Sequence, residues 1–269
     1  LGQSPGSRWP LLVPELMKAQ MKAQMNAQMN AQRVMTARRP IEEIYSQREM
    51  ASAIAAERIA SALRRRLAAG GEAVLVCSGG STPGRCYDAL SATPLDWSRV
   101  RVTLSDERWV PADDGKSNER LVRERLLRGE AREADFVPLY RQGLSPEQGC
   151  EALTADAGAG RLPRPFACSL LGMGEDGHFA SLFPDSAALA AGLDPAGDSL
   201  CLPVVTAASE LPRVTLTLAP LAESEEIVLL IFGEKKWAVY ERARDGDTSL
   251  PVAALLASAP TPVRVVWAP

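Results

Sequence analysis

The sequence predicts an α/β protein whose mostly parallel central sheet carries helices on both faces. Short apolar runs of strand length alternate along the chain with longer helical segments, which is the pattern of a parallel sheet covered on both sides. Hydrophobic residues make up 46% of the 269 residues and aromatic residues only 5%. With its abundant alanine, this composition favours helices packed on a sheet.

The predicted elements follow one another in a regular order. Alanine-rich residues 47–69 have apolar side chains at helical spacing, and Gly70 and Gly71 end this helix. Ser117 and Asn118 are suitable caps for a helix over 119–127. The other helices are predicted at 85–90, 146–156, 234–244 and 251–257. The strands are predicted at 73–77, 100–104, 166–171, 214–218, 227–232 and 263–267. Together these elements predict an open, Rossmann-like sheet.

The first 40 residues differ from the rest of the chain. Residues 17–32 read MKAQMKAQMNAQMNAQ, a near-repeat that would place a drifting apolar stripe on a helix. An interaction helix is one interpretation, but we favour a disordered or frayed extension, 1–40, that is dispensable for activity. The segment has no apolar core flanked by a cleavage site, so we expect no signal peptide. We expect a single α/β domain over 41–269.

Composition and charge argue against several classes of protein. The net charge of −3 gives no indication of nucleic-acid binding, and no apolar run is long enough to span a membrane. The five cysteines include no C-x-x-C pair, and their odd number favours a reducing, cytoplasmic compartment over a disulfide framework. Cys77 and Cys168 lie in apolar runs, where a free cysteine is usually a small buried hydrophobe.

The stretch GMGEDGH at 172–178 is the strongest candidate for a functional loop. It follows the apolar run 166–171, so we expect it at the carboxyl end of a buried strand, where open α/β sheets bind ligands, with a short helix beginning after it. His178 is the only histidine, and imidazole suits acid–base chemistry near neutral pH. Asp176 is placed to orient His178 or to stabilise its charge, and Gly174 permits close backbone approach to a ligand. The alternative is that His178 is an ordinary core or surface residue.

The stretch SGGSTPG at 78–84 predicts a strand-to-helix turn of small residues. Such a turn exposes backbone N–H groups and directs a helix N-terminus outward, which favours an anion and above all a phosphate at Gly80, Ser81 and Thr82. No lysine follows the glycines, so the turn does not match the P-loop pattern. The alternative is a tight turn with an N-cap.

Further charged residues are expected at the ends of sheet strands. The residues SDERWVP at 105–111 form the predicted exit loop of strand 100–104, and within this loop Arg108 suits bidentate anion binding. Arg213 and Lys236 lie at the mouths of two further sheet segments. Each cation taken alone is more typical of a solvated or paired surface group. One histidine and scattered cysteines leave no obvious ligand set, so we expect no metal.

Four blocks in a fixed order carry a resemblance to a known family: SGGSTP at 78–83, DER with VP and SN at 106–118, GMGEDGH with SLFP at 172–184, and RVTLT at 213–217. Over roughly residue 41 to the C-terminus the chain resembles the 6-phosphogluconolactonases. That family is similar in fold to the glucosamine-6-phosphate deaminases, which share the glycine turn and the Asp-Gly-His element. The deaminases continue after the histidine to Asn-Glu-Pro, whose Glu acts in ring opening. This chain has SLFP there instead, which favours the lactonase.

The resemblance implies hydrolysis of 6-phospho-D-glucono-1,5-lactone to 6-phosphogluconate, in the oxidative pentose phosphate pathway and without a cofactor. It implies that His178 is the general base, that Asp176 is its partner, and that N–H groups of the 172–177 loop stabilise the oxyanion. Asp106 is expected to hold sugar hydroxyls. The expected phosphate and substrate ligands are Gly80, Ser81, Thr82, Arg108, Gly174, Arg213 and Lys236.

Two other functions are left open by the sequence. One is a deaminase or isomerase acting on an amino-sugar phosphate. The other is a non-catalytic sugar-phosphate sensor, which would need a DNA-binding module, although residues 1–40 contain neither a helix-turn-helix pattern nor a basic face. Monomer and dimer are both compatible with the sequence.

Overall fold

The computed structural model describes residues 39–207 and 209–269 of the chain. Nearly all of the N-terminal extension predicted from the sequence lies outside the described residues, so its frayed or disordered character stays a prediction. The described elements begin with strand β1 (Ile41–Ile44) and end with strand β10 (Val263–Ala268).

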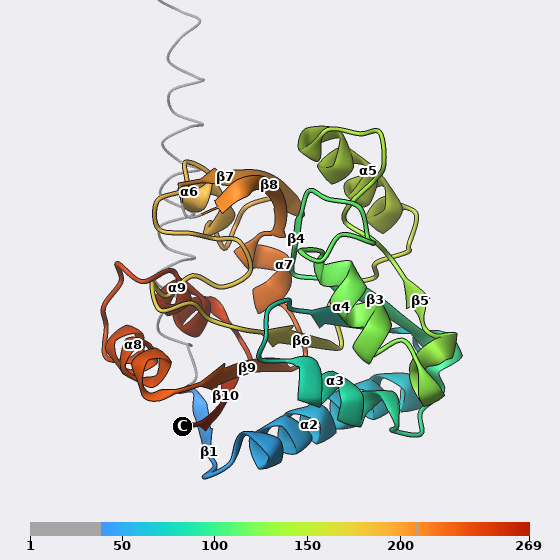
Figure 1. Ribbon diagram of the computed structural model, residues 1–269, viewed down its shortest axis with the longest axis horizontal. Helices are drawn as coiled ribbons and strands as arrows, with labels where there is room; N and C mark the ends of the chain where they lie inside the picture. Colours follow the sequence, from blue (N-terminus) through green and yellow to red (C-terminus); the bar gives the residue numbers. More distant parts are fainter. Residues whose placement is uncertain (1–38, 208) are drawn as a thin grey trace, which may run out of the picture. The chain divides into compact units, whose positions relative to one another are not determined.

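A seven-stranded sheet, parallel at every pairing, is the main structural layer (Figure 1). This arrangement confirms the predicted open α/β sheet. In spatial order its strands are β1, β10, β9 (Ile227–Phe232), β6 (Cys168–Leu171), β2 (Ala73–Cys77), β3 (Val100–Leu104) and β5 (Asp135–Phe136). The edge strands β1 and β5 escaped prediction because β1 carries two glutamates and β5 has only two residues.

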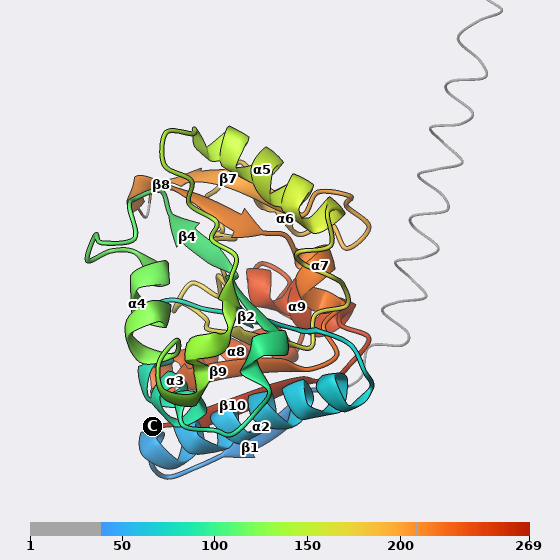
Figure 2. The ribbon, with the colours of Figure 1, turned by 90° about the vertical axis from the view of Figure 1, so that its right-hand side faces the viewer.

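Helices cover both faces of this sheet (Figures 1 and 2). Helices α2 (Arg48–Ala68) and α3 (Gly84–Ser91) lie on one side, and α7 (Leu218–Ala222) and α9 (Pro251–Ser258) lie on the other. The remaining α-helices of the described part are α4 (Asn118–Arg125), α5 (Pro146–Gly158), α6 (Leu189–Gly192) and α8 (Glu234–Arg244). Two short 3₁₀ helices are η1 (Trp97–Arg99) and η2 (Gly129–Glu133).

A second, antiparallel sheet contains β4 (Asp106–Arg108), β8 (Ser209–Leu216) and β7 (Cys201–Thr206). Two expectations are therefore wrong. Residues 106–108 form a strand rather than an exit loop, and the strand predicted at 214–218 lies in this sheet and ends at Leu216. An apolar run indicates a strand without showing its partner, and the polar β4 is defined by its pairing with a segment about a hundred residues away.

Ser105 connects the two sheets. Its backbone N–H donates to the carbonyl of Cys77 at 2.8 Å, and its carbonyl accepts the N–H of Leu216 at 2.8 Å. Cys77 is the last residue of β2, and Leu216 is the last residue of β8. The chain therefore passes from the carboxyl end of β3 directly into the antiparallel sheet, which brings β4 and β8 to the ligand-binding end of the parallel strands.

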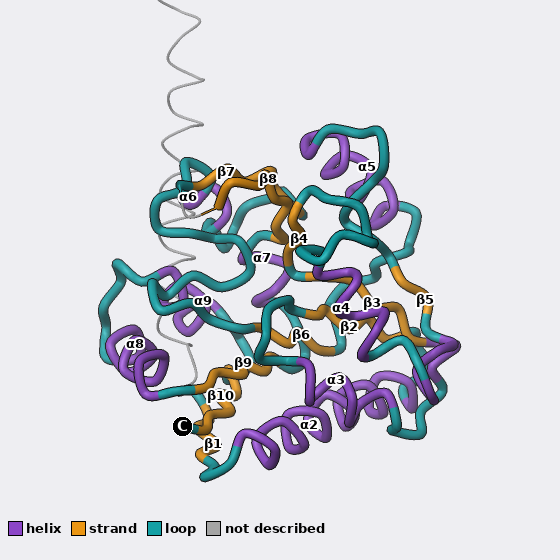
Figure 3. The backbone as a smooth tube through the Cα atoms, in the orientation of Figure 1, coloured by secondary structure: helices purple, strands orange, loops and turns teal. Residues whose placement is uncertain are grey.

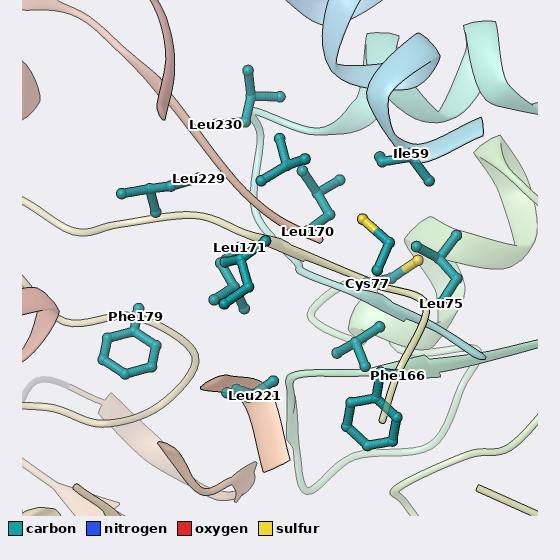
Figure 4. Close-up of a cluster of buried hydrophobic side chains, with 14 of the residues drawn as sticks. Ile59, Leu75, Cys77, Phe166, Leu170, Leu171, Phe179, Leu221, Leu229 and Leu230 are labelled. Carbon is teal, nitrogen blue, oxygen red and sulfur yellow. The ribbon is translucent and has the colours of Figure 1, made fainter. Parts of the chain in front are cut away.

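The core lies on both sides of the central strands, and Figure 4 shows part of it. Leu75, Leu170 and Leu229 come from three neighbouring strands and are fully buried. Ile59 packs onto this region from α2. Burial also raises the pKa of the Cys77 thiol to about 12, so this cysteine stays protonated and acts as a small hydrophobe, as predicted.

The chain after β6 is a loop with successive turns, as Figure 3 shows. The helix predicted to begin directly after GMGEDGH is absent there, and the next helix is α6 at Leu189–Gly192. Ala180 has a φ of +48°, outside the right-handed helical region, and Pro184 follows close by. The loop is therefore held in an irregular path at the carboxyl end of a fully buried strand.

Candidate active site

One cleft at the carboxyl ends of the central strands collects nearly all the residues that the sequence indicated. Its volume is about 230 Å³. Its lining residues are Ser78, Gly79, Gly80, Ser81, Thr82, Asp106, Arg108, Asn118, Gly172, Met173, Gly174, His178, Ala180, Arg213 and Lys236. Of the predicted site residues, only Asp176 is not among them. The glycine turn and β4 meet here because β2 and β3 are adjacent parallel strands.

His178 and Asp176 form a hydrogen-bonded pair beside the cleft. The imidazole Nδ1 lies 2.5 Å from Asp176 Oδ1, and the same oxygen accepts the backbone N–H of His178 at 3.2 Å. An ionised carboxylate can only accept, so Nδ1 carries the ring proton and Nε2 carries the lone pair. The pair thus has the arrangement of a base whose tautomer is set by a carboxylate.

Phe183 provides an apolar surface for both the imidazole and a guanidinium. Its ring centroid lies 4.2 Å from that of His178, with an angle of 34° between the rings. Arg213 Cζ lies 5.2 Å from the same phenyl centroid, within cation–π range. Because Phe183 is itself buried, it restricts the positions that either side chain can take.

The glycine at position 174 lets the backbone pass close to this pair. A Cβ at Gly174 would lie 2.3 Å from Cε1 and Nδ1 of His178 and 2.5 Å from Asp176 Oδ1. The N–H of Gly174 donates to the carbonyl of His178 at 2.9 Å, which closes the loop. Any larger residue at position 174 would push into the imidazole and the carboxylate.

Two arginines stand opposite each other on the antiparallel sheet. Arg108 of β4 and Arg213 of β8 are paired in register, and both line the cleft. Like charges directly opposite in a sheet repel each other. The Nε atom of each is buried, and neither has a hydrogen-bond partner within the described part of the chain. Two adjacent guanidinium groups at one cleft, each with an unpartnered Nε–H, favour an anion there.

The other contacts of these arginines hold them in place. Arg108 Nη1 donates to the carbonyl of Lys116 at 2.6 Å. Arg213 Nη1 lies 3.6 Å from Asp106 Oδ2 and 3.4 Å from Ser181 Oγ. Burial lowers the pKa of Arg213, while the charge of Asp106 opposes that fall. The guanidinium remains charged at neutral pH, because arginine loses its proton only at very high pH.

Lys236 adds a third cation from another element. It lies in the first turn of α8, after Gly233, and is half-buried at the cleft. Burial lowers the pKa of Lys236 from its ordinary value of 10.5, and the nearby carboxylates of Glu175 and Asp176 oppose that shift. A bound anion would favour the protonated amine and restore its affinity for the proton.

The glycine turn provides neutral donors for an anion. Gly80, Ser81 and Thr82 line the cleft directly before α3 begins at Gly84. The N-cap residue, Pro83, makes no side-chain hydrogen bond to the helix. The first N–H groups of α3 are therefore not satisfied by a side-chain cap and favour a negative ligand by their dipole.

Both carboxylate oxygens of Asp106, the residue predicted to hold sugar hydroxyls, accept hydrogen bonds from serine hydroxyls. Its Oδ1 accepts from Ser105 Oγ at 3.1 Å, and its Oδ2 accepts from Ser181 Oγ at 2.6 Å. Ser181 and Asn118 belong to the blocks that carry the family resemblance, but neither was predicted as a site residue. Asn118 lines the cleft, and its Nδ2 donates to the carbonyl of Asp106 at 2.9 Å. A polar residue at a helix start gives no sequence signal that separates a cap from a site residue.

The described residues offer neither a cluster of metal ligands nor a membrane-spanning helix. Among residues 39–207 and 209–269, no three or more His, Cys, Asp or Glu side chains are grouped so that they could hold a metal ion. None of the helices in the same residues is long and apolar enough to cross a membrane.

Comparisons with known proteins agree with this architecture. Residues 46–267 match the model of a family described as glucosamine-6-phosphate isomerases/6-phosphogluconolactonase. A 6-phosphogluconolactonase of Mesorhizobium japonicum is 46% identical over 80% of this chain and 89% of its own length. The crystal structure of a 6-phosphogluconolactonase from Shewanella baltica has a TM-score of 0.80 and 39% identity, covering 87% of this chain and 99% of that one. A monomeric glucosamine-6-phosphate deaminase, at 18% identity and a TM-score of 0.68, shares the fold. The chain belongs to the family of glucosamine-6-phosphate isomerases and 6-phosphogluconolactonases.

Proposed function

We propose that this chain hydrolyses 6-phospho-D-glucono-1,5-lactone to 6-phospho-D-gluconate, a step of the oxidative pentose phosphate pathway. The observation that carries the proposal is that one cleft contains both His178, whose imidazole is oriented by a carboxylate, and two arginines with an unpartnered Nε–H, Arg108 and Arg213. A base and an anion site so close together suit a substrate with an electrophilic carbonyl and a phosphate. The lactonase relatives add independent support.

His178 acts as the general base in this reaction. Its Nε2 takes a proton from water while the water oxygen forms a bond to C1 of the lactone. As the tetrahedral intermediate collapses, the C1–ring oxygen bond breaks, and the imidazolium returns a proton to that oxygen. The product leaves as a carboxylate after releasing one proton to solvent. Asp176 holds the imidazole in the required tautomer and stabilises its transient charge.

The backbone after β6 would stabilise the oxyanion. The N–H groups of Gly174 and Gly177 already donate within the loop, to the carbonyls of His178 and Gly174. Gly172 and Met173 are the other residues of this loop before His178 that line the cleft. Their backbone N–H groups are therefore the proposed oxyanion donors. Neither a cofactor nor a metal enters the proposed mechanism, because a lactone carbonyl is already electrophilic.

The phosphate would occupy the basic end of the cleft. Arg108 and Arg213 supply charged donors, the turn at Gly80, Ser81 and Thr82 supplies neutral donors, and Lys236 adds a third positive charge. Asp106 faces the same cleft and would hold sugar hydroxyls. Binding at the phosphate would fix the distance between C1 and His178, so that remote binding energy supports orientation at the reacting carbon. A cytoplasmic location stays part of the proposal, and the five free, buried cysteines support it.

Initial rates with freshly generated 6-phosphogluconolactone test the proposal. The purified chain should accelerate formation of 6-phosphogluconate far above the spontaneous rate, and His178→Ala should remove most of that acceleration. Glucosamine 6-phosphate is the control substrate, with ammonia release as the readout. Folded protein that leaves the lactone at its spontaneous rate would refute the proposal, and release of ammonia would assign the chain to the deaminases.

A further inference from the structure

Strand β4 presents its side chains alternately to the cleft and to the interior. Asp106 and Arg108 line the cleft, and Glu107, between them, points away from it. Glu107 has no exposed surface. A fully buried carboxylate is rare unless other groups compensate its charge, so we expect hydrogen-bond donors or cations around Glu107.

Four hydrogen-bond donors converge on the Glu107 carboxylate. Oε1 accepts the backbone N–H groups of Arg108 and Asn118, both at 2.8 Å. Oε2 accepts the hydroxyl of Ser117 at 3.0 Å and the backbone N–H of Glu119 at 2.7 Å. A carboxylate has two oxygens with about four lone-pair directions and no donor, so this site matches its acceptor capacity.

These bonds do more than cap a helix. Ser117 already caps α4, because its hydroxyl accepts the N–H of Arg120 at 3.2 Å. The Glu107 carboxylate instead ties β4 to the first turn of α4, whose first residue, Asn118, lines the cleft. Burial raises the pKa of Glu107 to about 7, and its backbone donors oppose the rise.

The position of Asn118 extends this link to the glycine turn. The Asn118 side chain donates to the carbonyl of Asp106 at 2.9 Å. A Cβ on Gly79 would lie 1.9 Å from Asn118 Oδ1, so the turn after β2 packs directly against this amide. A displacement of α4 relative to β4 would therefore disturb Asp106, Arg108 and the anion-binding turn together.

We propose that Glu107 is a positioning residue that holds Asp106, Arg108 and Asn118 in the geometry that binds the phosphorylated end of the substrate. The proposal rests on the proposed function for the identity of that substrate. Glu107 does not touch the ligand, and the general base lies on a different loop. Its loss should therefore weaken binding more than it slows the chemical step.

Glu107→Gln is the informative variant because it keeps the size of the side chain and reverses half of its hydrogen bonding. Each carboxylate oxygen of Glu107 accepts from two donors, so the NH₂ group of glutamine faces two donors in either orientation of the amide, and a donor cannot accept their hydrogen bonds. We expect KM for 6-phosphogluconolactone and Kd for 6-phosphogluconate to rise by roughly tenfold to a hundredfold, which corresponds to the loss of about one hydrogen bond to a charged group. The kcat and its pH profile should change much less, because the proposed general base, His178, lies on a different loop.

Glu124→Gln is the matched control, since Glu124 lies on the same helix and makes an exposed ion pair with Arg120. It should leave KM and Kd unchanged. Circular dichroism and thermal melting establish that each variant is folded. If Glu107→Gln does not fold, Ser117→Ala replaces it, because it removes one of the four donors, and a rise of about two- to fivefold in KM is expected.

The outcomes separate the two proposals. If Glu107→Gln is folded and its KM and Kd are unchanged, the positioning role is overturned. A lower kcat with unchanged KM also overturns it, because a residue that only supports the fold would reduce the fraction of active molecules and leave KM as it was. In the replacement test, Ser117→Ala with unchanged KM overturns it equally. If wild-type protein fails to hydrolyse the lactone, the proposed function is wrong, and calorimetric titration with inorganic phosphate still tests the positioning role on its own.

Discussion

Gly174→Ala tests whether the proposed catalytic pair, His178 and Asp176, depends on the close approach of the backbone. An added Cβ would lie 2.3 Å from two atoms of the imidazole and 2.5 Å from Asp176 Oδ1. Ordinary carbon contacts are near 3.5 Å, so the imidazole or the loop has to withdraw by about 1 Å. Gly174 is not among the glycines with positive φ, so alanine fits the backbone itself. The strain therefore falls on His178 and Asp176.

A withdrawal of this size would disrupt the 2.5 Å bond between Nδ1 and Oδ1. Misplacing a catalytic group by about 1 Å typically costs a hundredfold in rate, which corresponds to about 2.7 kcal/mol of transition-state stabilisation. We expect kcat of Gly174→Ala to fall by roughly that factor, with KM changed less because the proposed phosphate ligands lie on other elements: the turn after β2, strands β4 and β8, and helix α8.

Gly115→Ala, at a glycine that does not line the cleft, is the comparison. A Cβ there meets no heavy atom within 4 Å, and its φ also lies outside the positive range. Its kcat should fall by less than about tenfold, because no catalytic side chain has to move. Both variants need equal thermal melting before kcat is compared. Equal kcat values for Gly174→Ala and wild type, with the variant folded, would show that the pair tolerates displacement and that the reasoning is wrong.

Three further results follow from the same site. His178→Ala should lower kcat by at least about a hundredfold with the fold retained, and near-normal turnover would remove His178 as the base. Arg108→Ala should raise KM for the phosphorylated lactone much more than KM for unphosphorylated gluconolactone; equal effects would move the phosphate to Arg213 and Lys236. Burial lowers the pKa of Lys236, so inhibition by 6-phosphogluconate should weaken as the pH rises through a value below 10.5, where the amine loses its proton. In Lys236→Arg the inhibition should persist over the same pH range, because arginine stays charged. Identical pH profiles of inhibition for the two proteins would exclude Lys236 as a phosphate ligand.

The regular part of the fold was predictable because its signals are local. Strands β2 and β9 are continuous apolar runs, and β3 alternates apolar residues with Arg101 and Thr103; the bounds of all three agree with the sequence prediction. Helix α8 also has the predicted bounds. The short polar strand β4 could not be found in the same way, because its stability comes from pairing with β8 rather than from its own composition.

Most residues of the candidate site could also be predicted to lie together. The loops after β2 and β6 have distinctive compositions, so His178 and the glycine turn were identified from the sequence and lie at one cleft. Glu107 was seen only as part of an acidic pair beside an arginine. Its four donors come from both β4 and α4, and no sequence pattern indicates that such groups will converge.

The solitary imidazole at the cleft also makes the protein its own spectroscopic reporter. His178 is the only histidine in the chain, so its two ring C–H protons give the only histidine lines in a proton magnetic resonance spectrum. The phenyl ring of Phe183, 4.2 Å away, shifts those lines by its ring current. Any ligand that changes the angle between the two rings moves a signal that needs no isotopic labelling to assign. The same uniqueness directs a histidine-selective acylating reagent to the proposed general base, so the loss of one resonance and the loss of turnover can be followed in a single sample.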